Sequence, residues 1–178
     1  MEIKIEDLKV LFSEEQLQKR IKELAAEMNK FYNGEEVVAV CVLKGAVMFA
    51  TDLVKYLDMP LQMEFIRLSS YGSSTTTSGK VNAVDIKLPD LNGKNVLIIE
   101  DIVDTGLTAK FLMDFMHCNF NAKSIKFCSL LDKKITRKVD IEPDYYGFEV
   151  DDKFVVGYGL DYDGYYRNLC YIGYKEMA

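Results

Sequence analysis

Three acidic residues and a hydroxyl-bearing turn stand close together in the middle of the chain. Glu100 and Asp101 follow four aliphatic residues, and Asp104 comes after two more aliphatics. The turn Thr105-Gly106-Leu107-Thr108 follows directly. Hydroxyls and a small glycine suit a turn whose backbone N–H groups wrap an anion such as phosphate. Carboxylates beside such a turn could bind hydroxyl groups, hold a cation or move a proton.

These three acids also have a simpler interpretation. Like charges at short range repel one another, and partial burial adds to the cost of ionising them. Acidic residues at the end of a strand usually lie in a solvated loop, in which an Asp or Thr caps the next helix. That interpretation is weaker here because an anion-binding turn follows at once. The stretch therefore favours a ligand with a phosphate and hydroxyl groups.

Two strand-turn-helix units must position these residues. Residues 96–99 predict a strand buried on both faces, and residues 109–116 predict the helix after the turn. Residues 37–43 and 46–57 predict the same arrangement around Lys44-Gly45. The carboxyl ends of parallel strands and the N-termini of the following helices favour anions. Lys44 could bind one, although a surface lysine in a turn is the simpler interpretation.

The remaining patterns complete an α/β chain. Ser13 and Gln16 form a capping box that begins a helix, and Asn33-Gly34 ends it. Residues 63–68, 81–86 and 122–131 predict further strands. Strands that alternate with helices in 178 residues predict a single domain with a parallel sheet flanked by helices.

Residues 69–80 are rich in glycine, serine and threonine and offer little to bury except Tyr71. So long a polar stretch inside a compact domain is either a floppy hairpin loop or a functional segment. In the functional interpretation it is a lid over the active site, in which hydroxyls such as that of Ser70 contact phosphate and the ring of Tyr71 closes the lid.

Composition disfavours several classes of function. The net charge of −6 disfavours a general nucleic-acid binder. Cys41 and Cys128 stand in apolar runs and are expected to be reduced core residues of a cytoplasmic protein. The cysteine spacing and the lone histidine disfavour a zinc site, and no apolar run reaches transmembrane length, so no membrane partner is expected.

The acidic pair followed by Asp-Thr-Gly-x-Thr resembles the phosphoribosyl-pyrophosphate (PRPP) signature of type I phosphoribosyltransferases. The resemblance spans most of the chain, from Leu43 to about Arg167. Lys153 to Tyr162 is similar to the hypoxanthine-guanine branch of that family. It implies a Rossmann-like sheet, a lid at about 69–80, and a small hood built from about residues 1–12 and 145–178.

The resemblance also implies roles for the residues that carry it. The backbone of Asp104, Thr105, Gly106, Leu107 and Thr108 would wrap the ribose 5′-phosphate. Glu100 and Asp101 would bind the ribose hydroxyls, and Lys44, Gly45 and Arg167 would bind pyrophosphate. The peptide before Lys44 can be cis in relatives. Asp161 would hold Mg²⁺, with Glu100 and Asp101 as further candidates.

The base half of the site would lie downstream. Phe154 would stack on a purine, the backbone of Val155 would read its edge, and Lys133 would contact the 6-oxo group, with Lys134 as the neighbouring candidate. An acid beside two others in a closed site can exchange a proton near neutral pH, so Asp104 is the candidate proton carrier.

The implied reaction transfers the phosphoribosyl group of PRPP to hypoxanthine or guanine in a homodimer or homotetramer. Two alternatives stay open: an enzyme that prefers xanthine or another base, and a PRPP-sensing regulator with the same fold. The family often has a lysine where this chain has Leu107, which removes one cation near the phosphate but leaves the backbone turn.

Overall fold

The computed structural model describes residues 5–70 and 81–175. Its helices are η1 (Ile5–Asp7), α1 (Glu14–Tyr32), α2 (Val47–Val54), α3 (Leu107–Asn119) and η2 (Lys134–Thr136). Its strands are β1 (Lys9–Phe12), β2 (Val37–Leu43), β3 (Leu61–Ser70), β4 (Val81–Asp85), β5 (Asn95–Val103), β6 (Ser124–Asp132), β7 (Tyr145–Glu149), β8 (Val155–Val156) and β9 (Ile172–Tyr174).

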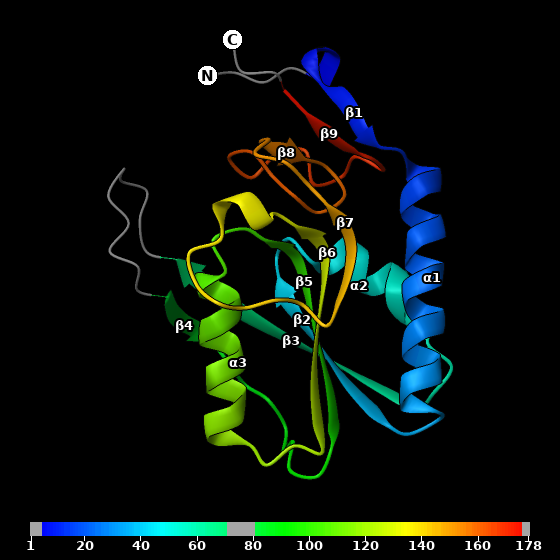
Figure 1. Ribbon diagram of the computed structural model, residues 1–178, viewed down its shortest axis with the longest axis vertical. Coiled ribbons are helices and arrows are strands. Elements are labelled where there is room, and N and C mark those ends of the chain that lie inside the picture. The colour runs from blue at the N-terminus through cyan, green and yellow to red at the C-terminus, as the bar shows by residue number, and fades with distance from the viewer. Residues whose placement is uncertain (1–4, 71–80, 176–178) are drawn as a thin grey trace.

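The six-stranded main sheet has the order β4-β3-β2-β5-β6-β7 (Figure 1). All its neighbouring strands are parallel except β4, which returns antiparallel to β3. The aliphatic runs of β2 and β5 lie at its centre, buried on both faces, as their composition predicts. This confirms the expected α/β class.

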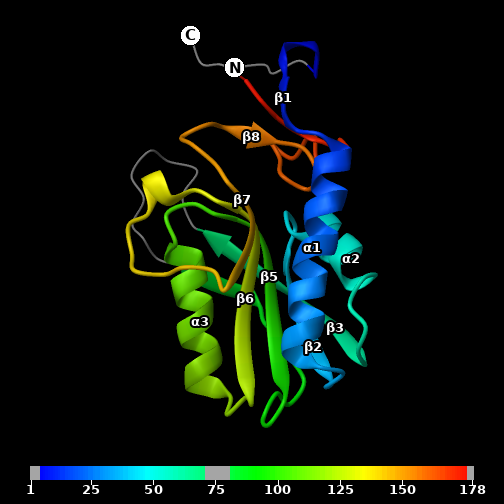
Figure 2. The ribbon, with the colours of Figure 1, turned by 45° about the vertical axis from the view of Figure 1, so that its right-hand side comes forward.

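The helices form a layer on each face of the main sheet. In Figures 1 and 2, α1 and α2 lie on one side and α3 lies on the other. Alternate residues of β2 serve the two cores: Val37 and Ala39 pack with α1 and α2, whereas Val38 and Val40 pack with α3. The period of two along a strand thus lets one short apolar run support both layers.

Local signals place the ends of α1 as the sequence predicts. The Ser13 hydroxyl accepts the N–H of Gln16, and the Gln16 side chain accepts the N–H of Ser13. Asn33 ends the helix in the left-handed conformation at φ 49°. The second helix is shorter than the expected 46–57, because α2 stops at Val54 and single turns follow it.

A three-stranded sheet of order β1-β9-β8 covers the end of the domain where the main-sheet strands finish (Figure 2). It joins the two ends of the chain, since β1 and β9 pair antiparallel. The expected hood reached back to residue 145, but β7 pairs with β6 in the main sheet. The small sheet therefore uses only the later part of that segment.

Three further expectations concern membrane-spanning helices, the cysteines and the lid. No helix among residues 5–70 and 81–175 is long and apolar enough to cross a membrane. Cys41 and Cys128 are buried with free thiols, as predicted. The lid expected over residues 69–80 lies mostly outside the described residues, because β3 ends at Ser70 and residues 71–80, including Tyr71, are not described.

Candidate active site

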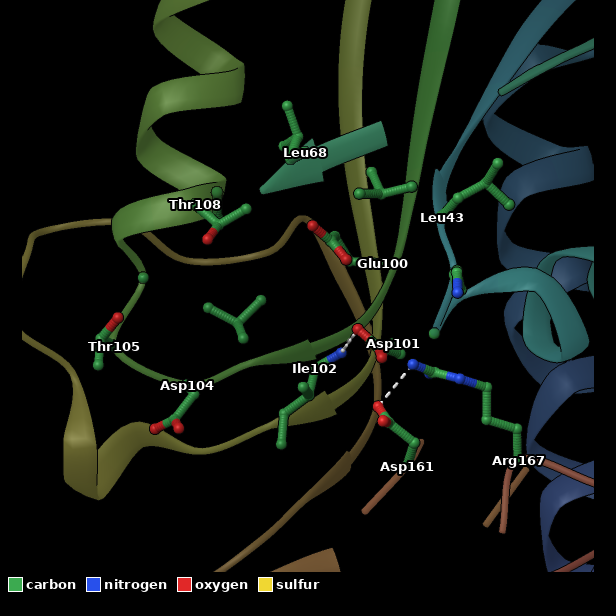
Figure 3. A pocket seen from close by; sticks show the side chains of 16 residues that line it. Leu43, Leu68, Glu100, Asp101, Ile102, Asp104, Thr105, Thr108, Asp161 and Arg167 are labelled. Atoms are coloured by element: carbon green, nitrogen blue, oxygen red, sulfur yellow. Dashed lines mark hydrogen bonds and ion pairs between the residues drawn. The ribbon is translucent and has the colours of Figure 1, made fainter. Parts of the chain in front are cut away.

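A cavity of about 320 Å³ opens where the central strands of the main sheet end. Figure 3 shows acidic side chains around it, with Asp104 and Thr105 on one side and Arg167 on the opposite side. Ten of the sequence-predicted residues line it: Lys44, Gly45, Glu100, Asp101, Asp104, Thr105, Gly106, Thr108, Asp161 and Arg167. They come from three stretches of the chain that lie far apart in sequence.

Strand register brings the first two stretches together. Cys41 of β2 lies level with Ile99 of β5 in a parallel pair. Two residues further along, β2 ends at Leu43 and β5 reaches Asp101. The peptide bond between Leu43 and Lys44 is cis. Gly45 then passes so close to Asp101 that a Cβ atom at position 45 would lie 1.6 Å from Oδ2 of that carboxylate. Only glycine fits this approach.

Glu100 and Asp101 are adjacent acids in a poorly solvated position. Burial, and then the neighbouring Asp101 carboxylate, raise the pKa of Glu100 well above its usual value. Burial also raises the pKa of Asp101, although the backbone N–H of Ile102 donates to its Oδ1 at 2.9 Å and opposes the shift. The pair is therefore set to retain a proton at a pH where free carboxyl groups have lost theirs.

The turn after β5 is held from outside the pocket. Gly106 adopts φ +82° and caps the N-terminus of α3, so Leu107 and Thr108 form the first helical turn rather than a loop. Leu107 does not line the cavity. The Asp104 carboxylate accepts a hydrogen bond from the hydroxyl of Thr136 in η2 and points away from Glu100 and Asp101 in Figure 3.

Asp161 and Arg167 form the third part of the pocket. Nη2 of Arg167 lies 2.6 Å from Oδ1 of Asp161, and the Gly164 N–H donates to Oδ2 at 2.7 Å. Arg167 also donates to the carbonyl of Gly159. A Cβ atom at Gly159 would lie 2.0 Å from the carbonyl oxygen of Gly45, so this segment packs against the loop that carries Lys44.

The predicted base-binding residues stand beside this cavity and do not line it. Lys133 directly follows β6, whose last residue pairs with Val103 of β5. The N–H of Lys133 donates to the Val103 carbonyl at 2.9 Å. Its Nζ lies 2.7 Å from Asp152. Phe154 is 44% exposed and meets Tyr162 edge to face. Val155 is buried in the small sheet.

The charged run from Asp132 to Lys138 is partly buried, although charged residues usually face solvent. Asp132 is fully buried and Lys133 is nearly so. Lys134, the alternative to Lys133, is more exposed and pairs with Glu149 at 3.1 Å. The side chain of Ser70 and the whole of Tyr71 lie outside the part of the chain that the structure describes.

Sequence reasoning missed some residues of the site. Ile102 and Leu68 line the cavity, and Arg137 bonds to the backbone of the turn after β5. Ile102 stands between the acids of the motif, so its position was a usable signal. The role of Arg137 had no such signal, because it depends on where the segment after β6 lies.

The carboxylate oxygens in the cavity suit a hard cation, most of whose ligands would be water molecules and substrate oxygens. Within the described residues no group of three or more histidine, cysteine or acidic side chains could hold a metal ion. The carboxylate of Asp161 nevertheless lines the cavity together with Glu100 and Asp101. Mg²⁺ prefers such oxygen ligands, and one or two protein carboxylates are enough when phosphates supply the rest.

The chain is similar to known proteins over most of its length. Residues 9–163 match the phosphoribosyl transferase domain family. The chain is 51% identical to the hypoxanthine-guanine phosphoribosyltransferase of Bacillus subtilis, over 96% of this chain and 94% of that protein. It is 43% identical to the hypoxanthine-guanine-xanthine phosphoribosyltransferase of Tritrichomonas foetus, over 93% and 90% of the two chains. A crystal structure of a hypoxanthine phosphoribosyltransferase from Staphylococcus aureus superposes with a TM-score of 0.90 at 43% identity, covering 96% of this chain and 93% of that one.

Proposed function

The chain belongs to the phosphoribosyltransferase family, and on that premise we propose that it transfers the phosphoribosyl group of PRPP to hypoxanthine or guanine and releases pyrophosphate. The observation that carries this proposal is the arrangement of the cavity. The turn that begins at Thr105 lies on one side, Arg167 and the end of β2 at Leu43 lie across from it, and Glu100 and Asp101 stand between them. That spacing suits a ribose with a phosphate at each end.

The ribose-phosphate half of the proposed site uses the end of β5 and the stretch that follows it. The N-terminus of α3 and the turn before it would bind the 5′-phosphate, since free N–H groups and the helix dipole favour an anion there. Glu100 and Asp101 would bind the two ribose hydroxyls. The raised pKa values of this buried pair support that role, because a shared proton lets one carboxyl group donate while the other accepts.

Lys44, the Gly45 backbone and Arg167 would hold the pyrophosphate. A guanidinium is a suitable partner because its planar donors match phosphate oxygens. Asp161 would hold Mg²⁺ beside them, and the bound cation would add positive charge at the leaving group. Arg167 is paired with Asp161, so both side chains would exchange this contact for substrate oxygens and the cation.

The base would stack on Phe154, with Lys133 at the 6-oxo group and the Val155 backbone at the purine edge. Lys133 would first have to leave Asp152. Asp104 would accept the proton from the purine ring nitrogen that attacks C1 of the ribose. As that bond forms, the bond to pyrophosphate breaks, and positive charge on the ribose is stabilised by the surrounding carboxylates.

One assay tests this function. Purified protein with PRPP and Mg²⁺ receives hypoxanthine, guanine, xanthine or adenine in turn, and nucleotide formation is followed. We expect product with hypoxanthine and guanine. Product with xanthine as well would match the relative from Tritrichomonas foetus. PRPP binding without product from any base would contradict the transferase and support the regulator.

We also infer a homodimer or homotetramer in the cytoplasm. Met48 of α2 and Phe65 of β3 expose apolar side chains that another copy of the chain could cover. The four free thiols suit a reducing compartment. Light scattering with size-exclusion chromatography tests the assembly, and a monomer at micromolar concentration would contradict it.

A further inference from the structure

We propose that Arg137 is a positioning residue that shapes the turn after β5 to receive the ribose 5′-phosphate. The inference rests on the proposed function, because it assumes that this turn binds that phosphate. Arg137 does not line the cavity. It lies behind the turn, on the segment that follows β6, and would act through the backbone.

The segment from Lys133 to Lys138 holds three successive carbonyl groups of the turn. Nε of Arg137 donates to the Asp104 carbonyl at 3.2 Å, and Nη2 donates to the Val103 carbonyl at 3.4 Å. The Lys138 N–H donates to the Thr105 carbonyl at 2.9 Å. In a trans peptide, the C=O of one residue and the N–H of the next point in opposite directions. Fixing these carbonyls on the outer side therefore turns the N–H groups of residues 104–106 toward the pocket, where a phosphate would need them.

The stem of Arg137 also fills the space beneath the turn. A Cβ atom at Gly106 would lie 2.7 Å from Cδ of Arg137 and 2.7 Å from Cγ2 of Ile141. Gly106 and the arginine stem are thus packed against each other. A shorter side chain at position 137 would leave Gly106 free to move into that space. The N–H groups around Gly106 would then no longer be held toward the pocket.

The guanidinium is itself fixed by a buried partner. It pairs with Asp132, which ends β6 with no solvent exposure, and it donates to the carbonyl of Ile141. The second carboxylate oxygen of Asp132 has no hydrogen-bond partner among the described residues. A buried ion pair is weak support for stability but can fix one geometry over others. Here four acceptors converge on a single planar group, which a lysine ammonium could not satisfy together.

The test compares two ligands that share the pyrophosphate group, since only PRPP carries the 5′-phosphate. Calorimetry measures the Kd of PRPP and of pyrophosphate, both with Mg²⁺, for the wild type and Arg137→Lys. We expect the Kd of PRPP to rise about ten- to hundredfold, as charge-assisted contacts are worth that much. The Kd of pyrophosphate should stay within about twofold.

Arg20→Lys is the matched control. Arg20 on α1 also donates to two backbone carbonyls, those of Tyr146 and Gly147, but at β7 and away from the cavity. It should lower thermal stability and leave both Kd values unchanged. Should Arg137→Lys fail to fold, the double variant Asp132→Asn with Arg137→Met removes both buried charges together and takes its place in the same comparison.

The outcomes separate the two proposals. If the wild type binds neither ligand, the proposed function fails. If the wild type binds both and the Arg137 variant weakens both equally, or neither, the positioning role is wrong while the proposed function stands. Selective loss of PRPP affinity supports the role.

Discussion

The carboxylate of Asp101 lies against Gly45, so closely that a Cβ atom at Gly45 would be 1.6 Å from its Oδ2. Gly45 follows the end of β2, and Asp101 lies near the end of the neighbouring strand β5. Their contact joins the proposed pyrophosphate loop to the proposed ribose-binding acids. Neither half of the pocket can therefore shift without moving the other.

Gly45→Ala should lower kcat/KM by about 100-fold, because the added methyl group must displace Asp101, and a shift of about 1 Å in a site costs that much. Steady-state kinetics with PRPP and hypoxanthine measure the effect. Gly93→Asn is the control, since Gly93 has φ +70° with open space around it, and asparagine tolerates that conformation. Near-normal activity in Gly45→Ala would show that the Asp101 position is not critical.

Asp104→Asn should reduce turnover far more than it weakens PRPP binding. An amide can still accept a hydrogen bond from the Thr136 hydroxyl, so the side chain keeps its place, but it cannot take a proton. A loss of about 100-fold or more in kcat is expected, within the range of general-base catalysis. Rapid-quench kinetics with calorimetric PRPP binding separate the two effects. An unchanged kcat would remove Asp104 from proton transfer.

Glu100→Gln should make the folded chain more stable at alkaline pH, although it should lower activity. Burial and then Asp101 raise the pKa of Glu100 above its usual value of 4.5, so the folded state favours the protonated form. Its contribution to stability is complete below pH 4.5 and is lost as the pH rises through the folded-state pKa. Glutamine cannot ionise and escapes that loss.

Thermal unfolding at pH 8 and pH 4 measures this difference. The variant should melt higher than the wild type at pH 8, by about 2–4 °C for each 1 kcal/mol, and the gap should close at low pH. Glu142→Gln, at an exposed loop position, is the control. A variant that melts lower than the wild type at pH 8 would mean that ionised Glu100 stabilises the fold.

Tyr158→Phe should lower stability by about 1 kcal/mol, the usual net worth of one hydrogen bond. The Tyr158 hydroxyl donates to Asp52 of α2 at 2.5 Å, where Gln18 of α1 donates at 2.8 Å and Lys55 at 2.7 Å. Asp52 keeps two donors in the variant, so the effect should stay moderate. Chemical denaturation measures it. Tyr165 is exposed, so Tyr165→Phe is the control. If both changes lower the stability equally, the hydrogen bond from Tyr158 to Asp52 does not stabilise the fold.

Local sequence was enough for the central strands and the helices beside them, and for the acids and the turn that line the cavity at the end of β5. The capping box at Ser13, the left-handed end at Asn33 and the strand-turn-helix unit around Gly106 each depend on residues a few positions apart. Such short-range preferences act the same way in any fold. The acids and the turn of residues 100–108 were readable for the same reason.

Only the tertiary structure decided which distant residues meet. The parallel register of β2 and β5 sets Gly45 against Asp101, and the register of β5 and β6 carries Lys133 and Arg137 to the back of the turn. Charged residues usually face water, yet Asp132 at the end of β6 is buried, and Arg137 supplies the charge that compensates it. Strand order and register are global results of packing both faces of one sheet, and no short window of sequence contains them.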